Sequence, residues 1–93
     1  MTREEWTTAV VDALDNILTQ CEHKMHLPFV VSVISPNGSC YVIRAHGRQL
    51  NLDYLAYHFE PHGFLMPEII TVVDQMGGAA AFRVSVEGIK QLH

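Results

Sequence analysis

The sequence has few basic residues. Six Lys and Arg stand against ten Asp and Glu, which gives a formal net charge of −4 with neutral histidines. Nucleic-acid binding depends on clustered cations that displace counterions, so this charge balance disfavours a nucleic-acid partner. Charged residues make up only 17% of the chain and hydrophobic residues 48%, which leaves little polar area to cover a small domain. The composition therefore favours a surface buried between two copies of the chain, as in a homodimer.

Long apolar runs are also missing. A membrane-spanning helix needs about 20 consecutive apolar residues, and the longest uninterrupted run here is only a handful. The first residues, MTREEW, contain neither the basic nor the apolar block of a secretory signal. We therefore expect no membrane association and a cytoplasmic location. Cys21 and Cys40 show no CxxC or disulfide-framework spacing, so we expect both thiols to be reduced.

Familiar catalytic motifs are absent as well. No G-x-S-x-G elbow, Walker loop, H-E-x-x-H pair or EF-hand loop can be written from these residues. The sequence therefore predicts no cofactor, and it favours a non-enzymatic protein over an enzyme.

What is present begins with a helix over residues 2–25. Thr2 and Glu5 form the T-x-x-E pattern of a capping box, and Leu27-Pro28 ends the helix. Apolar residues recur at spacings of three and four and form one stripe: Trp6, Val10, Ala13, Leu14, Ile17, Leu18, Cys21 and Met25. This stripe predicts a long amphipathic helix that packs on the rest of a single domain.

Residues 29–47 predict a β-hairpin. Two runs rich in β-branched residues flank Asn37-Gly38, a pair typical of a two-residue type I′ turn. Pairing outward from that turn puts three pairs on each face: Val33/Val42, Val31/Arg44 and Phe29/His46 on one, and Ile34/Tyr41, Ser32/Ile43 and Val30/Ala45 on the other. Both faces are largely apolar, so both need cover, from helices or from a second copy of the chain.

The remaining chain predicts two further helices and a strand. Asn51 is a suitable cap for a helix that ends before Pro61. Over residues 67–76 the terminal signals (Pro67, Gly77-Gly78) favour a helix, while five consecutive β-branched residues favour a strand. Residues 80–87 alternate as a strand should. The fold class is therefore α+β, with a long N-terminal helix packed on a small antiparallel sheet, in the order α-β-β-α-α-β and within one domain, 1–93.

The first candidate site is a basic cluster. Arg44, His46 and Arg48 alternate along the second predicted strand, and Arg83 joins them if its strand pairs alongside. Bidentate arginine contacts suit a carboxylate or phosphate, so the cluster predicts binding of a small anionic ligand. The plainer interpretation is a set of surface ion pairs with nearby carboxylates.

The second candidate is a metal site at His58 and His62, with Glu60 between them. Histidines at i and i+4 bind a metal when they stand one turn apart on a helix. Pro61 disfavours the helical conformation at Glu60, and in an extended segment at most two neighbouring ligands could bind one ion, so a further ligand would have to come from elsewhere. The plainer interpretation is a helix end with solvated polar side chains.

The cysteines, a glycine pair and a group of aromatic residues are weaker candidate sites. Cys21 belongs to the buried stripe, and Cys40 lies too far along its strand from His46 for a catalytic dyad. Gly77-Gly78 follow a predicted helix, where they cap its end rather than hold a phosphate. Four aromatic residues gather within eleven positions, as a pocket wall, a partner surface or core: Tyr54, Tyr57, Phe59 and Phe64.

Together these features predict a small cytosolic non-enzymatic module, homodimeric, that acts by binding a partner protein or a small anionic ligand. The alternative is a small metal- or anion-dependent enzyme that uses His58 and His62 or the Arg44-His46-Arg48 cluster.

Overall fold

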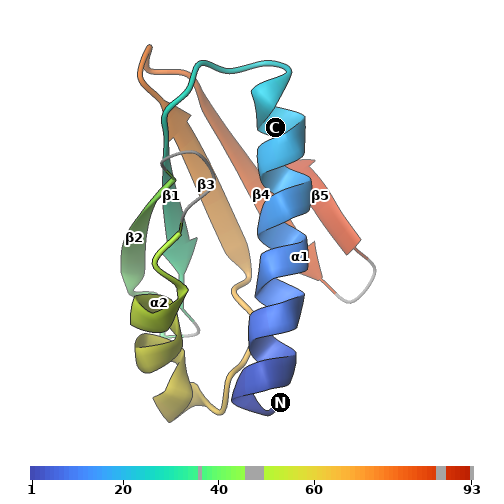
Figure 1. Ribbon diagram of the computed structural model, residues 1–93, viewed down its shortest axis with the longest axis vertical. Coiled ribbons are helices and arrows are strands. Elements are labelled where there is room, and N and C mark those ends of the chain that lie inside the picture. The colour runs from blue at the N-terminus through green and yellow to red at the C-terminus, as the bar shows by residue number, and fades with distance from the viewer. Residues whose placement is uncertain (36, 46–49, 86–87, 93) are drawn as a thin grey trace.

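The computed structural model describes residues 1–35, 37–45, 50–85 and 88–92, with the backbone alone at 44 and 45. Its elements are α1 (Arg3–Glu22), β1 (Phe29–Ile34), β2 (Cys40–Ala45), α2 (Leu52–Phe59), the 3₁₀ turn η1 (Glu60–His62), β3 (Ile69–Asp74), β4 (Ala79–Ser85) and β5 (Gly88–Leu92). The strands form one antiparallel sheet in the order β2-β1-β3-β4-β5. Both helices pack on the same face of this sheet (Figure 1). The predicted α+β class, with a long N-terminal helix on an antiparallel sheet, is confirmed.

Helix α1 begins and packs as its sequence predicts. The Thr2 hydroxyl accepts a hydrogen bond from the Glu5 backbone N–H at 3.1 Å, and the Thr2 N–H donates to Glu5 Oε1 at 3.1 Å. The Thr2 backbone N–H, and then the Thr2 side chain, hold the pKa of the Glu5 carboxyl below its ordinary value. The predicted stripe is buried from Trp6 to Cys21. The reciprocal cap and the apolar stripe together account for the start and the orientation of the helix.

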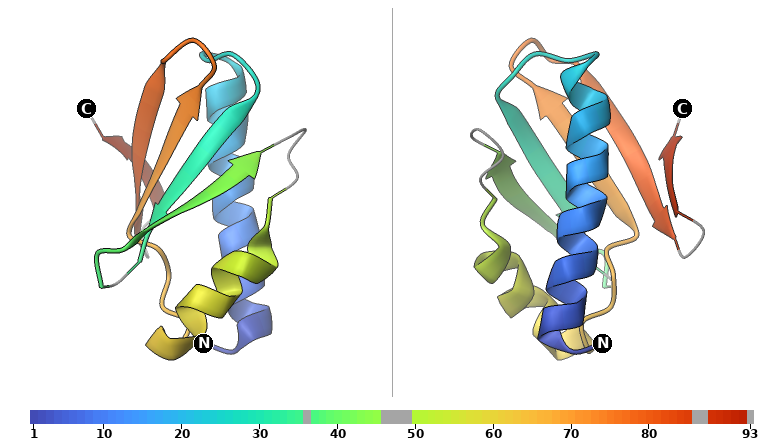
Figure 2. Two further views of the ribbon diagram at one scale, coloured as in Figure 1. Left: turned by 90° about the vertical axis from the view of Figure 1, so that its left-hand side faces the viewer. Right: turned by 45° about the vertical axis from the view of Figure 1, so that its right-hand side comes forward.

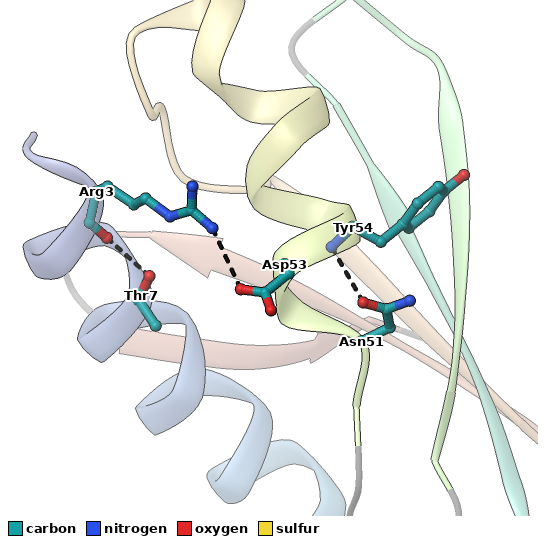
Figure 3. A network of polar contacts seen from close by, with 5 residues as sticks. All are labelled: Arg3, Thr7, Asn51, Asp53 and Tyr54. Carbon is teal, nitrogen blue, oxygen red and sulfur yellow. Dashed lines mark hydrogen bonds and ion pairs between the residues drawn. The ribbon is translucent and has the colours of Figure 1, made fainter.

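Trp6 joins α1 to α2 and to the loop that follows it. Its ring lies 5.4 Å from that of Phe59 and 5.7 Å from that of Phe64, and its Nε1–H donates to the Leu65 carbonyl at 3.1 Å. At the surface, Arg3 Nη2 lies 3.2 Å from Asp53 Oδ1, which links the first turns of the two helices (Figure 3). An ion pair this exposed contributes little to stability, so the packing of the buried Trp6 ring holds the two helices together more strongly than the ion pair does.

The β1–β2 hairpin has a different turn, and hence a different register, from the one predicted. Ser35 and Ser39 form the closing pair, with Ser35 N–H donating to the Ser39 carbonyl at 2.8 Å. Among the described residues of this loop, positive φ is confined to Gly38 (85°), whereas a type I′ turn needs it at Asn37 too. A two-residue turn would make residue 36 the hydrogen-bonding partner of Ser39, and a proline has no N–H to donate.

The pairing predicted from Asn37-Gly38 is therefore wrong by one residue. Each residue of β1 faces one position earlier in β2: Phe29↔Ala45, Val30↔Arg44, Val31↔Ile43, Ser32↔Val42, Val33↔Tyr41 and Ile34↔Cys40. A slip of one residue moves side chains to the opposite face. Tyr41 and Ile43 accompany Val31 and Val33 on the helix-covered face, and Val42 lies on the other face. The predicted partner of Phe29, His46, lies outside the described residues.

The helix predicted over 67–76 is also wrong. Ile69–Asp74 is the strand β3, which pairs with both β1 and β4. Gly77 and Gly78 belong to the β3–β4 turn rather than to a helix cap, with φ +85° at Gly77. The β-branched run decided the structure because a central strand buries every second side chain and pairs its backbone on both sides. The strand β5 is a further element that the predicted order α-β-β-α-α-β did not contain.

Asp74 connects the β3–β4 turn to the end of the α1–β1 connection. Its carboxylate accepts backbone N–H bonds from His26 (2.9 Å), Met76 (2.9 Å) and Gly78 (2.8 Å). A Cβ added to Gly78 would lie 2.8 Å from Asp74 Oδ2, so a larger residue there has to displace the carboxylate. The His26 bond, and then those of Gly78 and Met76, hold the pKa of Asp74 below its ordinary value against the opposing effect of burial.

We expect Gly78→Ala to lower the midpoint of thermal unfolding by more than Gly77→Ala. At Gly77 a Cβ meets open space, so the cost is that of a positive φ for alanine, about 1–2 kcal/mol. At Gly78 the Cβ displaces the Asp74 carboxylate. In an Asp74→Ala background the further cost of Gly78→Ala should shrink, whereas that of Gly77→Ala should not. An unchanged cost of Gly78→Ala in that background would contradict this account.

Acid should destabilise the protein partly through Asp74. Because its pKa is lower in the folded than in the unfolded chain, its contribution is complete above the unfolded value, about 3.9, and is lost as the pH falls through the folded value. The unfolding temperature, followed by circular dichroism from neutral to strongly acidic pH, should fall more steeply for the wild type than for Asp74→Asn. If the unfolding temperatures of the two proteins fell equally with pH, the three backbone hydrogen bonds would not favour the ionised carboxylate.

Candidate functional site

The side chains predicted as a metal site lie in one shallow depression. It has a volume of about 580 Å³, between β2 and the end of α2, and its lining residues are Tyr41, Tyr57, His58, Glu60, Pro61 and His62. We call it the aromatic depression. The depression contains His58, Glu60 and His62, which the sequence analysis considered together. It also contains Tyr41, which the predicted register placed on the face of the hairpin opposite Val31 and Val33.

The backbone after α2 explains how the two histidines reach one depression. Glu60 is helical (φ −54°, ψ −48°), and Pro61 occupies the first turn of η1. The expectation that Pro61 keeps Glu60 out of the helical region is therefore wrong, because Pro61 at the start of a new 3₁₀ turn needs no N–H and its preferred φ suits that position. The turn ends at Gly63, whose φ of 65° is left-handed.

The rings around His58 are arranged at two angles. The Tyr41 ring stacks on that of His58 at 4.2 Å and 21°. Tyr54 and Tyr57 approach His58 nearly at right angles, at 4.6 Å and 75° and at 5.3 Å and 82°. Tyr57 leaves 71% of its surface exposed. Of the four aromatic residues that the sequence grouped, Phe59 belongs to the core and Phe64 packs against it, while Tyr54 and Tyr57 are at the surface.

A three-ligand metal centre is not formed by the residues that the structure describes. No group of three His, Cys, Asp or Glu side chains among them is placed to hold an ion. His58 and His62 share the depression, but His58 is also stacked on Tyr41. Binding of a metal by this pair stays a prediction.

The basic cluster is divided by the sheet order. Arg44 pairs with Val30 through its backbone, and Arg83 is exposed on β4. Because β1 and β3 lie between β2 and β4, the pairing that would bring Arg83 alongside Arg44 does not occur. Strands are about 4.8 Å apart, so the two backbones are separated by about 14 Å across the sheet. His46 and Arg48 lie outside the described residues, and the anion site itself stays a prediction.

Both cysteines are free, as the sequence predicts. Cys21 is a core residue of α1, and burial raises the pKa of its thiol. Cys40 is exposed on the edge strand β2. A buried thiol whose pKa is raised is a poor nucleophile, so Cys21 has a packing role.

A second hollow, of about 510 Å³, lies between α1 and the β4–β5 hairpin. Its walls are mainly apolar and include Ala9, Ala13, Val84 and Ile89, with Asp12 and Asn16 among the polar lining residues. This lining offers van der Waals contact to an apolar group but no pair of groups for acid–base chemistry.

The face of the sheet opposite the helices is the largest candidate surface. Within the described ranges, α1 and α2 cover one face only, and a view from the β2 side of the molecule shows β1 and β2 in front of α1 (Figure 2, left). On the open face, Val30 is 40% exposed and Val42 52% exposed. The register places further apolar or small side chains beside them: Ile34, Ile69, Val73, Ala79, Ala81 and Leu92.

Among the described side chains of the open face, the charged ones lie toward one side. Arg83 and Lys90 face each other across β4 and β5, and both are exposed. The described side chains of β2, β1 and β3 on this face are apolar or are Ser, Thr and Cys. An antiparallel sheet with one solvated face normally carries polar residues there, so this part of the face is unusually apolar.

Sequence reasoning missed the positions of Tyr41 and Val42, and the signal that would have found them is Pro36. Without a backbone N–H, a proline cannot complete the closing pair of a two-residue turn after it. The next pair outward, Ser35 and Ser39, closes the loop instead, and this pair puts Tyr41 beneath α2.

Comparisons with known proteins give no relative. No family model matches the chain, and no curated protein or solved structure matches it. In the part of the chain that the structure describes, neither helix has the length and hydropathy required to cross a membrane.

Proposed function

We propose that the protein is a small cytosolic, non-enzymatic binding module that works as a homodimer, joined through the open face of its sheet. The observation that supports this proposal is the exposed apolar surface of β2, β1 and β3, where Val30 and Val42 are 40% and 52% exposed. Burial of apolar surface is the main driving force for protein association.

The size of the open face suits a second copy of the chain. The sheet has five strands, which are five to seven residues long. At about 4.8 Å per strand and about 3.3 Å per residue, the face measures roughly 24 by 20 Å, or about 480 Å² in projection. Two such faces stacked on each other bury about 1,000 Å², which is the lower limit for a specific interface.

A homodimer also fits the distribution of chemistry on this face. A two-fold interface places the same patch on both copies, so the patch must complement itself. An apolar patch does so without any charge pairing. Arg83 and Lys90 lie on β4 and β5, so a two-fold axis that runs along the central strand β3 lets the whole of both faces overlap and keeps these cations of the two copies apart.

Val42→Lys should convert the dimer into a monomer. Size-exclusion chromatography with light scattering at micromolar concentration should give about 21 kDa for the wild type, twice the chain mass of 10.5 kDa. The lysine places an unpaired charge in the interface and should weaken dimerisation at least about tenfold, or about 1.4 kcal/mol.

Leu65→Lys is the matched control for this experiment. Leu65 is 57% exposed but lies in the connection between η1 and β3, so this variant should stay dimeric. Circular dichroism checks that both variants are folded. A wild type that is monomeric throughout, or a Val42→Lys variant as dimeric as Leu65→Lys, would refute the homodimer.

The second candidate function is a small metal- or anion-dependent enzyme. The observation in its favour is that His58 and His62 line the same depression together with Glu60. Two imidazoles are a familiar part of zinc and iron sites, and because no three described side chains are placed to hold one ion, a further ligand would have to come from elsewhere.

Metal analysis of protein purified without a histidine tag separates the two functions. Under the binding-module proposal we expect far less than one equivalent of zinc, iron or nickel. A near-stoichiometric metal that is lost from the His58→Ala and His62→Ala variants would favour the enzyme instead. Retention of metal by both variants would place it elsewhere in the chain.

A further inference from the structure

We propose that the aromatic depression binds an organic cation, namely an alkylated ammonium or a guanidinium group. Such cations are held over the faces of aromatic rings at distances up to about 6 Å from the ring centre, often by rings set at right angles to one another. Tyr57 stands at 82° to His58, and Tyr41 stacks on His58 at 4.2 Å and 21°. All three rings line the depression.

Charge distinguishes a cation from other ligands that stack on aromatic rings. Glu60 lines the depression and is exposed at its edge, and no lysine or arginine is among the described residues that line it. The whole chain carries a formal charge of −4, so its field also attracts cations. A nucleotide or another anion would meet the Glu60 carboxylate there, with no lysine or arginine among the described lining residues to offset it.

The exposure of Tyr57 argues against a purely structural role for these rings. A large aromatic side chain that stabilises the fold is normally buried, as Trp6 and Phe59 are here. Tyr57 is instead 71% exposed and is positioned by its contact with His58. Pro61 lines the same depression. Its rigid ring has few conformations to lose when a ligand binds.

The depression is independent of the proposed dimer surface. Tyr41 lies on the helix-covered face of β2, whereas Val42 lies on the open face. Binding of a cation can therefore succeed or fail whatever the oligomeric state proves to be.

The test is a titration of the isotopically labelled full chain by nuclear magnetic resonance. The probes are choline and its neutral isostere 3,3-dimethylbutan-1-ol, in which carbon replaces the quaternary nitrogen, with ionic strength kept constant by sodium chloride. We expect choline to shift the aromatic resonances of Tyr41, Tyr57 and His58, and the alcohol to bind at least about fivefold more weakly. A third probe, an N- and C-capped arginine, asks whether a peptide guanidinium is taken as well.

Two pairs of variants connect the shifts to the depression. Tyr57→Phe keeps the ring and should keep binding, whereas Tyr57→Ala should lose about fivefold or more. Glu60→Gln should weaken binding, whereas Glu68→Gln, with the same change of net charge on an exposed residue before β3, should not. These side chains are exposed, so their replacement should leave the core intact.

Each outcome decides the proposal. Shifts with choline, with the arginine derivative or with both support it and define which cation is preferred. Equal binding of the neutral alcohol would show an apolar pocket instead, and an absence of shifts at Tyr41, Tyr57 and His58 with either cation would show no site. Either of these two results overturns the proposal and leaves the proposed homodimer untouched.

Discussion

The hydrogen-bonded pair Ser35–Ser39 is the contact on which both candidate surfaces depend. Every residue of the β1–β2 hairpin takes its partner from the position of that closing pair, and the position follows from Pro36, which has no N–H for a tighter turn. The β3–β4 turn closes in the same way, with Asp74 N–H donating to Gly78 and a single left-handed glycine, Gly77, before it. Three-residue loops of this kind set the register of both hairpins.

From that register follow the two surfaces to which we assign a function. With Tyr41 opposite Val33, the tyrosine ring reaches α2 and stacks on His58, while Val42 joins Val30 on the open face. The pairing expected from a two-residue turn would exchange these positions, because a shift of one residue reverses the faces of a strand. Neither the aromatic depression nor the apolar open face would then exist in its present form.

The parts of the fold that the sequence predicts are those with local and mutually consistent signals. The capping box of Thr2 and Glu5 and the apolar stripe determine α1, and Asn51 caps α2, as its contact with the Tyr54 N–H at 3.1 Å shows. At Ile69–Asp74 the local signals conflicted, and pairing with β1 and β4, which no local pattern contains, decided in favour of a strand. The histidine pair was recognised as a candidate site, but Tyr41 was not, since its place depends on a partner strand.

The two surfaces lie on opposite layers of the molecule, and this arrangement has a consequence for binding. The sheet stands between them, with Tyr41 and Val42 on opposite faces of β2, so a dimer formed through the open faces covers neither aromatic depression. Such a dimer would present two equal depressions on its two outer sides. A ligand with two cationic groups, long enough to reach both depressions, would bind the dimer more tightly than a ligand with one such group. Its second group would bind intramolecularly once the first is held. Self-association and ligand binding are thus compatible in a chain of only 93 residues.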